Sequence, residues 1–346
     1  MAECLALELL QSADWQEDAP LVSSFLASPW FPLLAEALGS LKREELYMSH
    51  VHGVGHIERT MVHGAMCAWA EKLCEGDSRL LLTMCAYHDT GRICDYLDGA
   101  HGRRSAEKLA SLTDLRGEDL REAMAGIEAH SLADRQMEDI LASRAPENLP
   151  RARRLAQMLK DADGLDRVRI GDLDLSYLRR PSSRERGRFA QRLFDCYAAL
   201  ERARGLEDGE GFRLSDIRRV KSLVKEKLAS GEGCVAAAQH AWDGLIGQPL
   251  GDTLPVGIPE TEACDIPQAA QRYFGALLAA RGMEEAELGE ICRAFVRRFR
   301  EQYGAASCAR PRPRKGCGGF LVDSILFSYQ YLYLENEKYI NGVGDP

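Results

Sequence analysis

The chain has 346 residues, 45% of them hydrophobic and 28% charged, which is enough apolar sequence for one large or two ordinary domains with real cores. Its formal net charge of -9 argues against a general binder of nucleic acids or membrane surfaces, since such proteins carry a basic excess. Eleven cysteines lie scattered without a paired rhythm, as is typical of reduced thiols in a cytoplasmic protein. No uncharged run approaches the roughly 20 residues that span a bilayer, and no secretory signal begins the chain, so we expect neither membrane insertion nor export.

The first half of the chain reads as a series of helices. Two short helical patterns, at residues 5–10 and 31–41, are separated by prolines and form an expected helical lead-in. A glycine-punctuated turn at residues 50–55 then enters a helix to about Leu73, whose apolar residues have helical spacing. Further helices are predicted over 79–87, 101–112, 117–130 and from Pro150 onward. Because strand-type alternation is absent before residue 200, we predict an all-α fold.

The second half keeps the helical pattern. We predict helices over 185–202, 214–228, 234–246, 266–280, 284–303 and 320–340. The Gly/Pro-rich stretch at 247–259 is the best candidate hinge. The last, tyrosine-rich helix is expected to pack as core or as the face of a homodimer.

An apolar helical run ends in the adjacent pair His88 and Asp89, which is followed by Thr90 and Gly91. Adjacent side chains on a regular helix point about 100° apart, so this pair can bind one ion only where the helix ends or kinks. Gly91 is expected to close the helix in the left-handed conformation and to leave both side chains free to converge.

The histidines are crowded into one region. Seven of the eight fall between His50 and His130, and most lie at predicted helix ends or loops. Together with two aspartates they form a mixed imidazole and carboxylate set, which suits Mn²⁺, Fe²⁺, Zn²⁺ or Co²⁺ and disfavours a cysteine-type structural zinc site. Two such ions can activate a water and clamp the oxygens of a phosphoryl centre. The candidate ligands are His56, His88, Asp89, His101, His130 and Asp163.

With these motifs in place, the sequence resembles the HD superfamily of metal-dependent phosphohydrolases. The resemblance rests on His56-x-x-Arg59, Tyr87-His88-Asp89-Thr90-Gly91-Arg92, His101-Gly102-x-x-Ser105-Ala106, Glu128-Ala129-His130-Ser131 and Asp161-Ala162-Asp163-Gly164-Leu165-Asp166. It places the defining ligands on His56, His88, Asp89 and Asp163, and the two additional histidines of two-metal members on His101 and His130. It covers roughly residues 47–180.

The resemblance implies a helical bundle at 47–200, between the lead-in at 1–46 and a helical extension at 201–346. It also implies a phosphohydrolase that uses water activated by two divalent ions of Mn, Fe, Zn, Co or Mg to cleave a phosphomonoester or phosphodiester, expected to be a nucleotide. Two departures from the family patterns make the substrates of two branches less expected. The Gly-Tyr-Pro signature of cyclic-di-GMP phosphodiesterases is absent, and Thr90-Gly91 stands where stringent-response hydrolases carry an acidic dipeptide.

Several basic residues adjoin the ligand motifs and offer contacts to a phosphate. We expect Asp89 and Arg92 to be catalytic, and we expect substrate contacts from Arg92, Arg104, Arg59 and His52. Two other functions stay open. The same six ligands also serve a mixed-valent di-iron oxygenase on this scaffold, and a non-catalytic nucleotide sensor or scaffold would need no turnover at all.

Overall fold

The computed structural model describes residues 4–93, 95, 98–206, 214–232, 234–246, 290, 293–295, 297–299 and 317–330, which form helices joined by turns and loops. None of these residues forms a β-strand, so the prediction of an all-α protein is confirmed. The chain divides into unit 1, Met1–Glu210, and unit 2, Gly211–Pro346. The predicted lead-in at 1–46 therefore lies within unit 1, and the predicted hinge at 247–259 lies outside the described residues.

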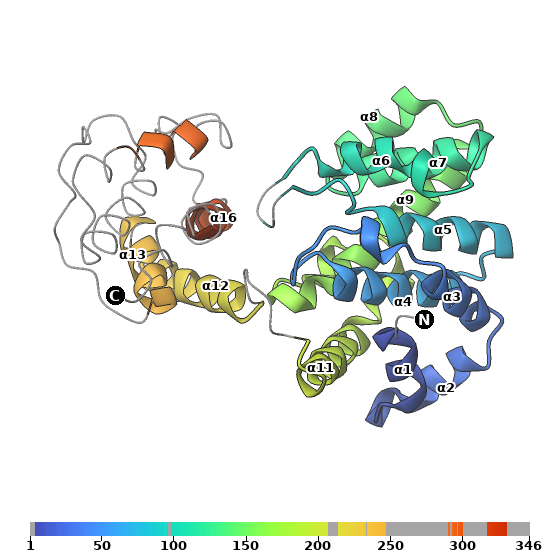
Figure 1. The fold of residues 1–346 in the computed structure, drawn as a ribbon, viewed down its shortest axis with the longest axis horizontal. Coiled ribbons are helices and arrows are strands. Elements are labelled where there is room, and N and C mark those ends of the chain that lie inside the picture. Colours follow the sequence, from blue (N-terminus) through green and yellow to red (C-terminus); the bar gives the residue numbers. More distant parts are fainter. Residues whose placement is uncertain are drawn as a thin grey trace, which may run out of the picture. The chain divides into compact units, whose positions relative to one another are not determined.

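Unit 1 is built around α4, and its helices pack about this centre (Figure 1). Helices α5, α7 and α9 pack with α4 as a bundle; α6 and α8 lie against α7, α3 lies against α4 and α5, and α1 contacts α11 and α4. Their bounds are α1 Leu5–Ser12, α2 Ala19–Leu26, α3 Trp30–Gly39, α4 Val54–Ala70, α5 Glu75–Tyr87, α6 His101–Leu112, α7 Gly117–Ala129, α8 Asp134–Arg144, α9 Leu149–Leu165, α10 Pro181–Arg184 and α11 Gly187–Ala203. Short 3₁₀ turns are η1 Gln16–Asp18, η2 Arg43–Glu45, η3 Asp166–Ile170 and η4 Leu175–Tyr177.

One helix differs from the sequence-based expectation. The pattern did not single out α8, whose Met137 and Leu141 complete an apolar cluster with small residues of α7 and α9. Only these two residues of α8 are buried, so its sequence carries little apolar periodicity. Helix α9, predicted from Pro150 onward, ends at Leu165, and Asp163 lies in its last turn.

Helix α4 is buried on nearly all sides. Every residue from His56 to Ala68 is buried, although the sequence predicts only one apolar face. A helix surrounded by others would ordinarily be apolar all round, yet α4 carries five polar or ionisable residues in its buried part. They are His56, Glu58, Arg59, Thr60 and His63. Burying a polar group costs free energy unless a partner satisfies it. Polar residues at these positions therefore indicate that α4 carries interactions other than apolar packing.

Unit 2 has a smaller described core. Helices α12 Leu214–Ala229 and α13 Cys234–Ile246 pack together, and α16 Cys317–Gln330 packs on both. Phe327 of α16 lies with Phe295 and Phe299 at centroid distances of 5.9 to 6.1 Å. The described part of the tyrosine-rich helix is thus core of unit 2, while the second half of its predicted span lies outside the described residues.

Within the described residues, no individual helix combines the length and apolar character required to cross a membrane. The pair Gln16–Leu26 and Trp30–Gly39 passes that test only when joined, and the two helices make an angle of 89°.

His63 gives a prediction about stability and pH. It is fully buried, its ring lies edge-on to Phe189, and neither ring nitrogen has a hydrogen-bond partner among the described atoms. Burial lowers the pKa of His63 from 6.5 to about 4. Between these pKa values His63 is protonated in the unfolded chain but neutral in the folded protein. Its contribution to the free energy of unfolding is therefore fully present above pH 6.5 and is lost as the pH falls toward 4. The full loss is roughly 3 kcal/mol.

We therefore expect His63→Leu to remove this contribution to the pH dependence. Urea unfolding at pH 7.5 and pH 5 measures it, and the wild-type protein should lose roughly 2 kcal/mol more than the variant over that interval. His63→Gln, which keeps a polar side chain but does not titrate, should behave like His63→Leu in its pH dependence. A wild-type-like dependence in both variants would contradict the assignment.

Candidate metal centre

Five helices bring the six predicted ligands together in unit 1. His56 lies in the first turn of α4, His101 begins α6, and Asp163 lies in the last turn of α9. His88 and His130 are the C-terminal caps of α5 and α7, and Asp89 follows His88 directly. Two sets of ligand atoms each lie within 4.8 Å of one another, His56 with His88 and Asp163, and His88 with Asp89 and His130. All four histidines and Asp89 are buried.

The Nδ1 atom of each of these histidines faces a hydrogen-bond acceptor. His88 Nδ1 donates to the Cys85 carbonyl at 2.9 Å, His130 Nδ1 to the Ile127 carbonyl at 2.6 Å, and His101 Nδ1 to the Asp98 carbonyl. The first two acceptors are carbonyls of a last helical turn, where the regular hydrogen bonding of the helix ends. A carbonyl can only accept, so Nδ1 carries the proton and Nε2 presents a lone pair.

His56 is oriented by a carboxylate instead. Its Nδ1 lies 2.8 Å from Oδ2 of Asp166, and its Nε2 points into the cluster. A carboxylate behind the distal nitrogen fixes the ring and increases the basicity of the ligating nitrogen, as is common for metal-binding histidines. Asp166 is therefore a supporting residue that the sequence analysis did not assign. Its spacing of three residues from Asp163 at a helix end was the available signal.

The Nε2 atoms meet in two close pairs. His56 Nε2 lies 3.2 Å from His88 Nε2, and His101 Nε2 lies 2.9 Å from His130 Nε2. Because Nδ1 holds the proton in each ring, these contacts set lone pair against lone pair. Burial lowers the pKa of His56 to about 4 and also lowers that of His88, so neither ring offers a second proton near neutral pH. Such contacts become favourable when a cation accepts both lone pairs, and the donor set therefore fits metal ions.

Asp89 faces both pairs with different oxygens. Its Oδ2 lies 3.6 Å from His56 Nε2 and 3.8 Å from His88 Nε2, while its Oδ1 lies 3.2 Å from His101 Nε2 and 3.5 Å from His130 Nε2. Oδ1 is buried without a hydrogen-bond donor, since the neighbouring imidazole protons are on Nδ1. Asp163 Oδ1 joins the first pair, 3.5 Å from His56 and 4.0 Å from His88. One carboxylate thus lies between two sets of nitrogen ligands.

The electrostatic surroundings keep both carboxylates ionised. Burial raises the pKa of Asp89, but the charge of Arg92 outweighs it and holds this pKa well below its ordinary value. Burial also opposes ionisation of Asp163, but His56 and His88, which become protonated in the acid range where this carboxyl titrates, and Arg169 lower its pKa to about 2. Ionised carboxylates and neutral imidazoles are the forms that bind divalent metals.

Gly91 does not have the predicted conformation. The glycines with positive φ in the described residues are Gly117, Gly171, Gly205 and Gly231, so the expected left-handed closure at Gly91 is wrong. Glycine is needed there because a Cβ would lie 2.4 Å from the Ser105 backbone nitrogen and 2.6 Å from the His101 carbonyl oxygen. The missing side chain lets α6 abut the turn after α5, and this approach brings His101 to Asp89.

Arg92 and His52 lie beside the metal ligands. Arg92 Nε donates to Asp89 Oδ2 at 2.9 Å, and its side chain is 13% exposed. The His52 ring lies edge-on to His56 at 5.9 Å, and its Nδ1 is 2.9 Å from Oδ1 of Asp95. Ser49 Oγ donates to the same oxygen at 2.5 Å. Asp95 thus fixes the His52 ring, a role for which the sequence carried no local signal.

Arg104 and Arg59 are held by other parts of the protein. Arg104 bonds the Gly91 carbonyl at 2.7 Å and the Asp98 carboxylate, so it joins α6 to the turn after Asp89. Arg59 is buried beneath His56, where its guanidinium donates to both oxygens of Asp166 at 2.6 and 3.0 Å. The structure therefore places Arg59 behind the ligands rather than among the groups that face a substrate, because its Nε and Nη2 donate to Asp166.

Asp166→Asn is expected to weaken both the fold and the site. The change leaves Arg59 buried without its counter-charge, which costs about 3 to 5 kcal/mol of unfolding free energy. It also removes the carboxylate behind His56, which lowers metal affinity by about 10- to 100-fold. Urea unfolding and calorimetric titration with Mn²⁺ measure the two effects.

Asp172→Asn is the control, because Asp172 pairs with Arg167 where both side chains are nearly half exposed. It should change the unfolding free energy by less than about 1 kcal/mol and leave Mn²⁺ binding intact. Equal effects of the two substitutions would rule out the supporting role of Asp166.

Comparison with known proteins agrees with this geometry. A family model of the HD domain matches residues 53–168, a range that contains all six candidate ligands. Neither curated proteins nor solved structures yielded a match. The family match and the helical cluster of histidines and aspartates lead to one conclusion: residues 53–168 form an HD domain, a domain of a superfamily of metal-dependent hydrolases.

Proposed function

We propose that the protein is a phosphohydrolase that cleaves a phosphomonoester or phosphodiester bond in a small phosphorylated molecule such as a nucleotide. The observation that carries the proposal is the convergence of four imidazole lone pairs on one buried carboxylate, Asp89. This arrangement has no role in the packing of unit 1, since it places like groups against each other. It is what a pair of metal ions requires.

The donor set divides into two positions. His56, His88 and Asp163 would hold one ion and His101 with His130 the other, and Asp89 would contribute an oxygen to each. Ions of Mn, Fe, Zn, Co or Mg bound there would supply Lewis acidity toward a phosphoryl oxygen and activate a water molecule.

The chain's own residues position the substrate. Arg92 remains next to Asp89 at the edge of the ligand cluster, where a guanidinium can donate to phosphoryl oxygens as their negative charge grows. Burial, together with Arg92 and Arg169, lowers the pKa of His52 well below its ordinary value, so this ring is neutral. With Nδ1 directed to Asp95, His52 can accept a hydrogen bond from a substrate hydroxyl or from water through Nε2.

A phosphorylated substrate is negatively charged, and so is the chain as a whole, so positive charge is needed at the site itself. Arg92 supplies this charge next to the ligand cluster, where its Nε lies 2.9 Å from Asp89 Oδ2. The overall charge of -9 still disfavours long nucleic acids, which need a broad basic surface. A small substrate is therefore the better match.

A screen with added Mn²⁺ against nucleotides and other phosphoesters tests the reaction class. Release of phosphate or of a nucleoside product supports the hydrolase. Turnover that requires dissolved oxygen would identify the oxygenase alternative, and binding without turnover would identify a sensor.

Metal content gives a separate prediction. Elemental analysis of the saturated protein should find two ions per chain, and the double variant His101→Ala/His130→Ala should retain one. One ion per chain in the wild-type protein, with none lost in the double variant, would refute the two-ion assignment.

Asp89→Ala should abolish turnover, while Arg92→Ala should reduce it by about 10- to 100-fold, the loss expected for one charge-assisted contact. Asp89 contributes to both ion positions and Arg92 to neither, so the aspartate has the larger effect. Arg103→Ala is the matched control, because Arg103 is 65% exposed and pairs with Glu107 on the surface of α6. It should leave the rate unchanged.

Circular dichroism and metal content are to be measured for all three variants. An Asp89→Ala protein that keeps both ions and most of its activity would disprove the mechanism.

A further inference from the structure

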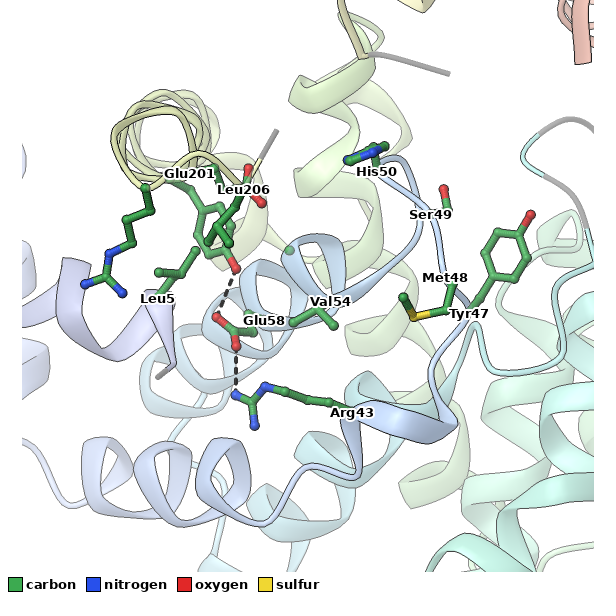
Figure 2. Close-up of a pocket in the computed structure, with 13 residues that line it drawn as sticks. Leu5, Arg43, Tyr47, Met48, Ser49, His50, Val54, Glu58, Glu201 and Leu206 are labelled. Carbon is green, nitrogen blue, oxygen red and sulfur yellow. Dashed lines mark hydrogen bonds and ion pairs between the residues drawn. The ribbon is translucent and has the colours of Figure 1, made fainter. Parts of the chain in front are cut away.

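A cavity lies in unit 1, among α1, α4, α11 and the segment that precedes α4 (Figure 2). Its volume is ≈ 960 Å³, at the upper end of the range for pockets that enclose small organic ligands. None of the six candidate metal ligands lines it. We propose that this cavity is a binding site for an uncharged, largely apolar small molecule, separate from the metal centre.

The walls of the cavity are mainly apolar. Aliphatic or aromatic groups come from Leu5, Tyr47, Met48, Val54, Tyr197 and Leu206. They belong to separate stretches of the chain, so the concave surface exists only in the folded protein. An apolar ligand would remove these groups from water, and this transfer is the main source of affinity in such pockets.

Met48 and Leu206 are unusual among these residues. Met48 is 83% exposed and Leu206 54% exposed, and they are two of the few large hydrophobic side chains that the described surface leaves in water. Figure 2 shows the Met48 thioether directed toward Val54 from the facing segment. A flexible thioether adapts readily to apolar partners of different shape. A ligand in the cavity would cover Met48.

The charged groups of the cavity already have partners. Arg43 donates to Glu58 at 2.8 Å, the interaction drawn at the centre of Figure 2. The other oxygen of Glu58 accepts from Tyr197 Oη and from the Ala6 backbone nitrogen, both at 3.0 Å. With three donors, the buried Glu58 carboxylate has no need of a cationic ligand.

The far wall is balanced in the same way. Arg204 pairs with the carboxylate of Glu8. Glu201 of α11 and Arg59 of α4 also approach the same point, next to Gly55. A Cβ built on Gly55 would lie 3.1 Å from Glu201 Oε1 and 3.2 Å from Arg59 Nη1, so an acid and a base lie close together there. A charged ligand buried here would lose its hydration without meeting an unmatched counter-charge, and this loss of hydration is strongly unfavourable in free energy. The balance therefore favours a neutral ligand.

Two dyes that differ mainly in charge test the proposal on the full-length protein. N-phenyl-1-naphthylamine is neutral, and 8-anilinonaphthalene-1-sulfonate has the same ring system with a sulfonate; both fluoresce strongly in apolar surroundings. We expect the neutral dye to bind saturably with one molecule per chain, and the sulfonate to bind at least about tenfold more weakly. Both titrations are done in EDTA, so that neither dye is held by metal.

Two exposed apolar residues provide matched variants. Met48→Asp puts a carboxylate at the cavity rim and should weaken binding of the neutral dye by at least about tenfold. Tyr177→Asp makes the same kind of change at a residue that is 75% exposed and does not line the cavity, and it should alter the affinity by less than about twofold. Val54→Trp, which fills the cavity, should also weaken binding.

The outcomes are separable from those of the phosphohydrolase test, because dye binding needs neither metal nor turnover. Absence of saturable binding of the neutral dye to the wild-type protein would overturn the proposal. So would sulfonate binding as tight as that of the neutral dye, or equal effects of Met48→Asp and Tyr177→Asp. If Val54→Trp fails to fold by circular dichroism, Met48→Asp, whose side chain is mostly in water, still decides the matter.

Discussion

The candidate metal centre depends on the buried ion pair between Arg59 and Asp166. Both residues are almost fully buried, and the guanidinium meets both carboxylate oxygens. The pair joins the middle of α4 to the residue that follows α9, and Phe194 and Tyr197 of α11 lie over the guanidinium at 5.2 and 4.8 Å. Such a pair contributes little net stability compared with apolar packing, but removal of one member would leave a buried charge unpaired and strongly destabilise the fold. The pair acts mainly by fixing the position of Asp166, which in turn orients His56.

The ligand cluster itself opposes folding. Imidazole nitrogens about 3 Å apart repel when both present lone pairs, and the Asp89 carboxylate is desolvated among them. The surrounding helices keep these groups in place through bonds from each Nδ1 to a carbonyl or carboxylate and through the apolar core of unit 1. Metal binding would relieve the repulsion and so stabilise the folded state, by an amount that grows with the logarithm of the ion concentration above the dissociation constant. The site is thus preorganised at the expense of the metal-free protein, as functional sites often are.

Helix α4 separates two different environments. His56 on one side belongs to the candidate metal centre, while Val54 and Glu58 on the other line the cavity of Figure 2. The segment before α4 serves both, since Ser49 lines that cavity and also donates to Asp95, which holds His52. The N-terminal residues contribute as well, through the bond from Ala6 to Glu58. Residues 4–46 are therefore part of the structure of unit 1 and help to form this cavity.

The sequence by itself determined the helical class, most helix positions and the set of candidate ligands, because helical periodicity is local and because histidines at helix ends form a readable pattern. It also identified His88 and Asp89 as the centre of that set. Only the tertiary structure decided which supporting residues act. Asp166 and Asp95 lie 110 and 43 positions from the histidines they orient, and no local pattern encodes such distances. It likewise decided that Arg59 supports the ligands from behind and that Gly91 is required by the close approach of α6, since both depend on what packs against them.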